Sequence, residues 1–166
     1  MHTIFEGEKP VMLKLPEKIA AACAPLFAAV PFEQSMNHLV GGHPQQTALV
    51  EQILKDPALQ GRQDLAAGIW LYVDDLDRSH TVSQGLENTT GAYWHGIMHR
   101  REGDFSNGHY WMRKAAAHPL RHSDPNLDPD ALIDAVASAN GEEVPELVAR
   151  QRAEWKNLFE WCAVNR

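Results

Sequence analysis

Two histidines lie four residues apart in the stretch Tyr93–Lys114, which reads YWHGIMHRREGDFSNGHYWMRK. On a helix, His95 and His99 would project from one face and could reach a single ion. Asp77 and His80, which are three residues apart, would share a helical face in the same way. Two antiparallel helices carrying these pairs would supply three imidazoles and one carboxylate. The spacing therefore predicts a site for a divalent ion of zinc, iron or manganese, formed by these four side chains.

Two neighbouring residues could do chemistry beside such an ion. A metal ion with an open coordination position lowers the pKa of a bound water, and Glu102, one turn beyond His99, could accept the proton. Arg100 is the candidate for holding an anionic substrate, because a guanidinium binds carboxylate or phosphate in a two-pronged geometry. This interpretation is a metal-dependent enzyme, a hydrolase or an oxidoreductase. Without an ion, Asp77 and His80 could join Glu102 and His99 in acid–base chemistry, with Arg100 or Arg113 holding an anionic substrate.

The same residues have a structural interpretation. On a helical wheel, His95, His99 and Glu102 centre about 135 degrees from the aromatic side of their helix, so they could form a solvated face. His80 continues an apolar stripe, where a histidine is more often a hydrogen-bonded core residue, and Asp77 would be its natural partner. The sequence leaves open whether these imidazoles face a cavity or the solvent.

A third interpretation involves no catalysis. The charged residues of the stretch could form a buried or half-buried ion network that fixes the register of two helices. The members of this network would be Arg100, Arg101, Glu102, Asp104, His109 and Arg113. The favoured interpretation is accordingly an interaction or small-ligand-binding domain built on a polar His/Arg/Asp cluster. Its partner would be another protein or a small anionic ligand, and the metal-dependent enzyme is the alternative.

Local signals predict a tight helical hairpin across this stretch. Thr89 or Thr90 can cap a first helix that runs to about Glu102. Gly103 follows, and a glycine just past a helix end takes the left-handed conformation readily. Asp104 can cap a second helix, with Ser106 as a competing cap. That second helix should end near residue 117, because the residue before a proline avoids the helical region.

Further helices are predicted from apolar residues that recur every three or four positions. The helix over 64–84 carries Leu65, Ile69, Tyr72, Val73 and Leu76 on one face, and its next inward position is His80. A short link over 85–89 makes this helix the antiparallel neighbour of the hairpin. Other helices are expected over 16–30, 44–54, 129–140 and 145–162. No alternating strand pattern occurs, which predicts one all-α domain over 1–166, a bundle or array of about six to eight helices.

Part of the hairpin resembles known helical repeats. EGDF at 102–105 and YWMRKA at 110–115 resemble the turn and second helix of a tetratricopeptide or Sel1-type repeat. The likeness covers about one hairpin, and no second copy occurs at the period of about 34 residues that a solenoid needs. The string YWHGIMHRREGDFSN with its following YW also resembles a microbial protein family in which it is the most recognisable block. That resemblance implies a helical domain and no particular activity.

The composition and net charge of the chain argue against some classes of binding partner. The chain has 166 residues, of which 15 are basic and 22 acidic, for a formal charge of -7. This balance argues against nucleic acid or an anionic membrane as the main partner. No apolar run approaches the 18 or so residues of a membrane span, and the N-terminal residues lack a signal-peptide pattern. The two distant cysteines, Cys23 and Cys162, fit a reducing compartment, so a cytoplasmic protein is expected.

Overall fold

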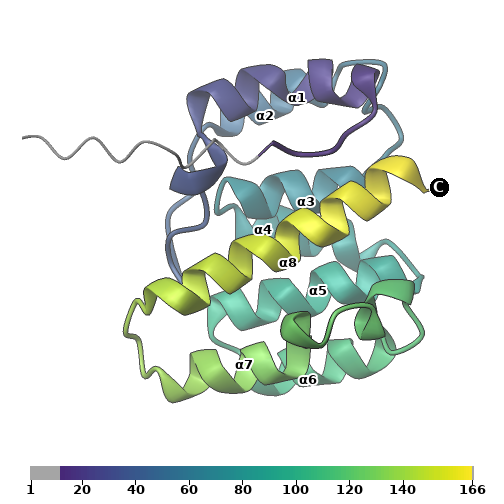
Figure 1. Cartoon of the computed structure of the whole chain (residues 1–166). Coiled ribbons are helices and arrows are strands. Elements are labelled where there is room, and N and C mark those ends of the chain that lie inside the picture. Colours follow the sequence, from purple (N-terminus) through teal and green to yellow (C-terminus); the bar gives the residue numbers. More distant parts are fainter. Residues whose placement is uncertain (1–11, 166) are drawn as a thin grey trace, which may run out of the picture.

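The computed structural model describes residues 12–165, and all regular structure within them is helical (Figure 1). This finding confirms the predicted all-α class. None of the described helices is both long and apolar enough to cross a membrane. The α-helices are α1 (Glu17–Ala29), α2 (Thr47–Ile53), α3 (Gln63–Tyr72), α4 (Leu76–Gln84), α5 (Thr89–Glu102), α6 (Phe105–Lys114), α7 (Pro129–Ser138) and α8 (Pro145–Val164). Three short 3-10 turns are η1 (Phe32–Gln34), η2 (Pro119–His122) and η3 (Pro125–Leu127).

The helices are stacked largely in chain order. In Figure 1, α1 and α2 form the top layer, α3 and α4 the next, then α5, with α6 and α7 at the bottom. Each helix from α3 to α7 packs on the next one in sequence. The last helix, α8, runs diagonally across the front and contacts both α3 and α7. One continuous apolar core therefore extends from Ile19 of α1 to Ala163 of α8.

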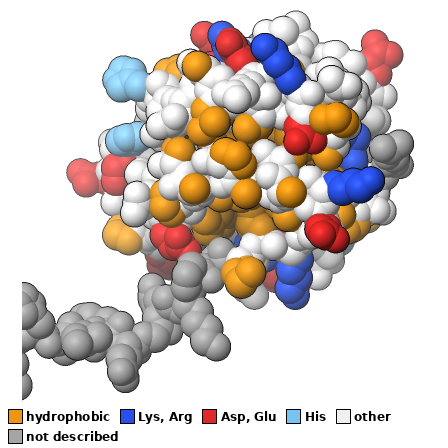
Figure 2. Space-filling view, turned by 90° about the horizontal axis from the view of Figure 1, so that it is seen from above, with side chains coloured by type: hydrophobic (Ala, Val, Ile, Leu, Met, Phe, Trp, Pro, Cys, Tyr) orange, Lys and Arg blue, Asp and Glu red, His pale blue; other side chains and the backbone are white. Residues whose placement is uncertain are grey.

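The outermost helix, α1, has a buried and an exposed side. Its buried side carries Ile19, Cys23 and Leu26. Figure 2 shows the molecule from this end, with hydrophobic side chains spread among charged ones. The exposed residues of α1 include Ala21, Ala24, Ala28 and Ala29. Because alanine side chains are small, α1 covers the core at one end of the stack without exposing large apolar groups.

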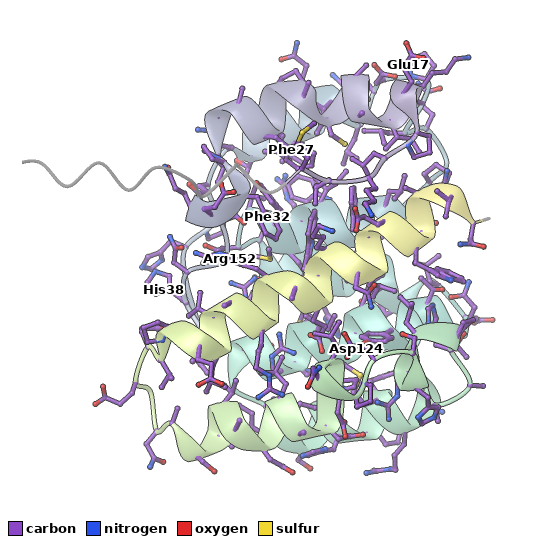
Figure 3. All side chains as sticks on the ribbon, in the orientation of Figure 1. Glu17, Phe27, Phe32, His38, Asp124 and Arg152 are labelled. Atoms are coloured by element: carbon purple, nitrogen blue, oxygen red, sulfur yellow. The ribbon has the colours of Figure 1, made fainter. Side chains whose placement is uncertain are left out.

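Aromatic rings connect the α1 layer to α8. The indole N–H of Trp155 on α8 donates to the carbonyl oxygen of Gly68 on α3, at 2.8 Å. The ring centroid of Trp155 lies 5.0 Å from that of Tyr72, and Phe27 meets Tyr72 edge-on at 5.3 Å. In Figure 3 the labelled Phe27 and Phe32 lie between α1 and α8. These contacts join α1, α3 and α8 across a large sequence separation.

The central helix is α5, whose residues from Thr90 to Arg101 are all buried. Glycines let its neighbours come close. A Cβ atom on Gly68 of α3 would lie 2.7 Å from the Trp94 ring, and one on Gly96 would lie 2.8 Å from the Met112 side chain of α6. Such distances are below van der Waals contact, so α3 and α6 approach α5 more closely than side chains would permit.

The predicted continuous helix over 64–84 is wrong. The chain leaves the helical path after Tyr72, and Asp74 adopts a left-handed conformation with φ +62. The Asp74 carboxylate accepts a hydrogen bond from the Arg101 guanidinium at 2.5 Å, and Arg101 also donates to the carbonyl oxygen of Leu71 at 2.9 Å. This partner lies on another helix, so no local pattern in the sequence reveals the break. The chain turns there, and α4 packs back against α3.

The hairpin of α5 and α6 is confirmed, with one changed cap. Gly103 follows the last residue of α5 with φ +86, and the side chain of Asp104 accepts the backbone N–H of Asn107 at 3.1 Å. The start of α5 differs from the prediction. Asn88, rather than Thr89 or Thr90, caps it by accepting the N–H of Gly91 at 2.8 Å. The second helix ends at residue 114, a few residues earlier than expected.

His109 connects α6 to α7, so its contacts extend beyond the α5–α6 hairpin. Its two ring nitrogens lie 2.8 Å from carboxylate oxygens of Asp130 and Asp134 on α7. Asp130 also accepts a hydrogen bond from Arg121 at 2.9 Å. An imidazole can donate from both nitrogens only when it is protonated. Burial lowers the pKa of His109, but hydrogen bonds and charge from the two aspartates outweigh that effect and raise the pKa above its ordinary value.

His109 should make the stability of the protein depend on pH. Its folded-state pKa lies above the unfolded value of about 6.5, so its contribution is complete below that pH and is lost as the pH rises through the folded pKa. We expect the melting temperature of the native protein to fall more steeply than that of His109→Gln between about pH 6 and pH 8.5. Circular dichroism at matched ionic strength measures both slopes. Identical slopes would contradict this account.

Gly103→Ala should destabilise the protein by about 1 kcal/mol, because a residue with a Cβ atom resists the left-handed region. The added atom would also lie 3.1 Å from the Val40 side chain. Gly85→Ala is the matched control, since Gly85 has φ -81 and ordinary space around it. Urea unfolding of the two variants gives the comparison. Equal stability of both would mean that the turn is not limited by its backbone conformation.

Asp74→Asn should cost about 3–5 kcal/mol, because it leaves the buried Arg101 charge without its counter-ion. Asparagine keeps the size of the side chain and tolerates the left-handed conformation, so the substitution isolates the charge. Asp77→Asn, at an exposed position of α4, is the control. Free energies of unfolding in denaturant measure both. A cost below about 1 kcal/mol for Asp74→Asn would show that the pair contributes little.

Candidate metal centre

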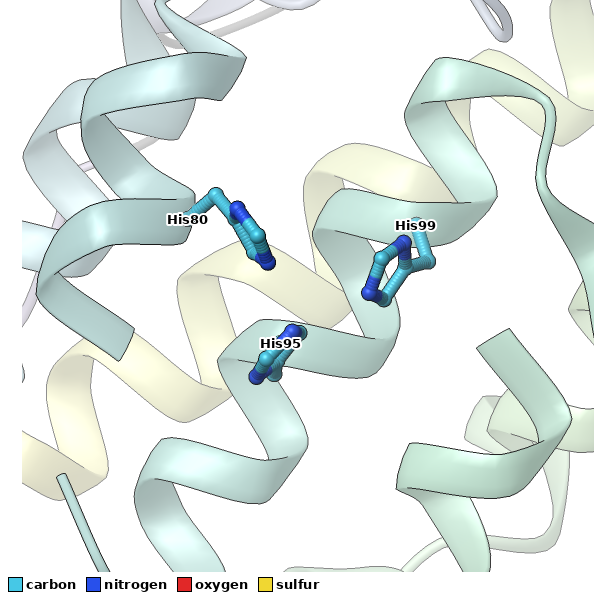
Figure 4. Close-up of side chains that lie close together, drawn as sticks. All are labelled: His80, His95 and His99. Carbon is cyan, nitrogen blue, oxygen red and sulfur yellow. The ribbon is translucent and has the colours of Figure 1, made fainter. Parts of the chain in front are cut away.

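Three histidine side chains converge between α4 and α5. His80 comes from α4, and His95 and His99 come from consecutive turns of α5 (Figure 4). The ring centroid of His80 lies 4.7 Å from that of His95 and 5.4 Å from that of His99. The centroids of the His95 and His99 rings are 4.8 Å apart. One nitrogen from each ring lies within 4.8 Å of the other two. We refer to these three residues as the histidine cluster.

Local contacts explain why His80 faces α5. The side chain of Asp75 accepts the backbone N–H of Arg78 at 3.1 Å and so caps the start of α4. One turn later, the hydroxyl of Ser79 donates to the carbonyl oxygen of Ala67 on α3, at 2.9 Å. Because successive helical residues are rotated by about 100 degrees, fixing Ser79 against α3 directs His80 to a different side of α4. That side is the one covered by α5.

The cluster is largely removed from solvent. His95 is 3% exposed and His99 is 8% exposed, whereas His80 is half-buried. The buried Nδ1 atom of His95 has no hydrogen-bond partner among the described residues. Leaving a buried polar atom unpaired costs about 1–3 kcal/mol, so such a site is one that a bound ligand would satisfy. The alternative left open by the sequence, a solvated face, therefore does not apply to His95 and His99.

Burial also sets the protonation state of His95. Desolvation, followed by the nearby His99 and His80 rings, lowers the pKa of His95 from 6.5 to about 3. The ring is consequently neutral at physiological pH. Neutral imidazole is the form that carries a free lone pair and binds metal ions. The electrostatic environment thus favours a ligand role over an ion pair for His95.

Trp111 of α6 holds the His95 ring in place. The two rings stack with their centroids 3.8 Å apart and their planes only 11 degrees from parallel. On the helical hairpin, His95 and Trp111 are equally distant in sequence from Gly103. Residues placed symmetrically about a tight turn face one another in an antiparallel pair, so this signal was available in the sequence. The contact of Trp111 with the cluster is a finding of the structure.

Glu102 positions His99. Its carboxylate oxygen Oε1 lies 2.6 Å from Nδ1 of His99. If Nδ1 carries the proton and donates it to Glu102, the Nε2 lone pair of the same ring is free for an ion. Carboxylates commonly orient metal-bound histidines in this manner. The carboxylate that was expected as a proton acceptor therefore lies beside the cluster, with one oxygen engaged by a ring of that cluster.

The structure does not bring the other two predicted residues to the cluster. Asp77 is exposed on α4, and its carboxylate is not among the atoms that converge with the three imidazoles. Arg100 is fully buried and lies against α8, where it donates to Glu154 at 2.6 Å and to Gln151 at 3.4 Å. A guanidinium enclosed in this way cannot meet a substrate. Arg100 consequently has a structural role, and the expected catalytic role does not fit its position.

The histidine cluster and its two supporting side chains, Glu102 and Trp111, come from three helices that are consecutive in the chain. Together they provide three imidazole nitrogens, a carboxylate that orients one of the rings and an indole that stacks on another. Comparison with protein-family models, with curated proteins and with solved structures found no match.

Proposed function

We propose that this protein binds one divalent transition-metal ion, zinc, through His80, His95 and His99, and that it is a metal-dependent hydrolase. The convergence of one nitrogen from each ring within 4.8 Å is the observation that carries the proposal. Three protein ligands with a fourth position left for water are typical of catalytic zinc sites. Zinc–nitrogen bonds of about 2.05 Å separate tetrahedral ligands by about 3.4 Å. Small rotations of the imidazole side chains would close the remaining difference.

The ligand set favours zinc among the three metals that the sequence indicated. The converging atoms are imidazole nitrogens, with no carboxylate among them once Asp77 is set aside. Imidazole suits zinc, copper, iron and nickel, whereas carboxylate-rich sets suit manganese and magnesium. The Glu102–His99 contact adds the carboxylate–histidine arrangement that is frequent around zinc. Since zinc has no redox chemistry, this choice favours a hydrolase over an oxidoreductase.

Each side chain of the site would have a defined part. A bound zinc ion would lower the pKa of a coordinated water toward neutrality. Glu102 would fix the tautomer of His99, and Trp111 would fix the ring plane of His95 and exclude water from that side. His80 would hold the ion from α4 and is the most exposed of the three side chains. Glu102 is thus a positioning residue in this proposal.

An interaction domain has less support from the described residues. Three of the charged side chains that favoured it are engaged within the fold. Arg100 pairs with Glu154, Arg101 with Asp74, and His109 with two aspartates of α7. These groups are therefore not free to bind a partner. The interaction-domain interpretation stays as the second prediction, to be preferred if no metal binds.

The test is zinc binding by protein purified without a histidine tag. We expect one zinc ion per chain by elemental analysis and by calorimetric titration of the metal-free protein. His95→Gln should abolish stoichiometric binding, and Glu102→Gln should weaken it about 10- to 100-fold. His122→Gln, which changes an exposed histidine outside the cluster, is the control. Circular dichroism verifies that each variant is folded.

The affinity should also fall at acidic pH, because protons compete with the ion for the imidazoles. Absence of stoichiometric zinc in the native protein, or equal binding by His95→Gln, would overturn the proposed site. Zinc binding without hydrolysis of any ester, amide or phosphate substrate would retain the site and remove the enzyme assignment.

A further inference from the structure

A groove lies beside the histidine cluster, with a volume of about 530 Å³. Its walls come from the end of α4, the link over 85–88, the beginning of α5 and the last turn of α6. Ser83 and Ala92 line two of these walls, and Trp111 lines a third. The volume falls within the range of about 300–1,000 Å³ that small-molecule sites occupy.

The groove continues the helix faces that carry the histidines. Ser83 is one turn after His80 on α4, and its hydroxyl donates to the carbonyl oxygen of His80 at 3.2 Å. Ala92 is nearly one turn before His95 on α5, on the same side of that helix. Trp111 belongs to both sites, since it lines the groove and stacks on His95. A molecule in the groove would therefore lie against the same indole ring that supports the cluster.

One of the residues that line the groove, Lys114, is a cation. The Lys114 ammonium lies 5.3 Å from the ring centre of Tyr110 and 5.8 Å from that of Trp111. No carboxylate of residues 12–165 lies within the 4.0 Å of an ion pair with it. Glu87, in the exposed link, is the acidic residue of the lining. Thr89, the first residue of α5, adds the positive end of a helix dipole.

We propose that this groove is the substrate-binding site and that it takes a small organic anion with an apolar or aromatic part. The anionic group, a phosphate or carboxylate, pairs with Lys114. The apolar part packs on the edge of Trp111 and on Leu86, and the molecule extends toward the histidine cluster. The word substrate rests on the proposed hydrolase function, whereas the binding of an anion in the groove does not depend on a metal.

The probe is phenyl phosphate, titrated into zinc-free protein by calorimetry and then into zinc-loaded protein. Loss of one charge-assisted contact should weaken its binding about tenfold in Lys114→Gln. Arg113→Gln is the matched control, because it removes the same charge from the neighbouring residue, which does not line the groove. We expect that control to bind within about twofold of the native protein. Glu87→Gln should bind the probe more tightly, since it removes the opposing charge.

The outcomes separate the two proposals. Equal binding of phenyl phosphate by Lys114→Gln and the native zinc-free protein, or no binding by either, would overturn the groove proposal while leaving zinc binding by the histidines untouched. A loss confined to Lys114→Gln would support the groove even if the zinc titration fails. Zinc affinity should be unchanged in Lys114→Gln, and a parallel loss of zinc would mean that the substitution disturbs the cluster itself. All three exposed substitutions are checked by circular dichroism for an unchanged fold.

Discussion

The ion pair between Arg101 and Asp74 is the constraint on which the rest of the arrangement depends. It stabilises the left-handed turn that ends α3 and begins α4, and both side chains are almost fully enclosed. The backbone of Arg101 is restrained as well, because its carbonyl oxygen accepts the N–H of Gly41 at 2.7 Å. Buried ion pairs add little net stability, since desolvation offsets the attraction. Their effect here is to select one path for the chain, which returns α4 along α3 and places His80 against α5.

The preceding residue, Arg100, restrains the same end of α5 from another direction. It pairs with Glu154 of α8, so two adjacent arginines connect α5 to elements on different sides. Gln151 of α8 extends this connection by donating to the carbonyl oxygens of Met36 and His38 at 2.9 and 3.0 Å. The rotation of α5 about its axis is consequently fixed. That rotation determines that His95 and His99 face α4 and α6 rather than the solvent.

Features that depend on neighbouring residues could be predicted from the sequence, and those set by distant partners could not. The turn at Gly103 and the cap at Asp104 follow from local chemistry, and both were found. The break at Asp74 depends on Arg101, which is 27 residues away. Because the apolar periodicity continues across Asp74, the break could not be predicted from it. Arg100 was taken for a substrate-binding group because its partner, 54 residues later, gives no local signal.

The same distinction between neighbouring residues and distant partners applies to the candidate site. The spacing of His95 and His99 fixes their common face, whatever the tertiary structure. His80 was included because a continuous helix was assumed, and it reaches the cluster although that helix is broken. Asp77 was included on the same assumption but lies on the exposed side of α4. The orientation of α4 is set by Ser79 bonding to Ala67, and the sequence contains no local indication of that bond.

The burial of α5 on all sides has a consequence for local opening of the protein. Helices enclosed by others exchange their amide hydrogens only in large or global unfolding events, whereas peripheral helices open separately at a lower free energy. His95 and His99 stand on the enclosed helix, and His80 stands on the shorter and more exposed α4. The cluster therefore combines two imidazoles on the enclosed helix with one on a peripheral helix, which is expected to open at a lower free energy. Departure of α4 would uncover the two fixed imidazoles without unfolding the core that holds them.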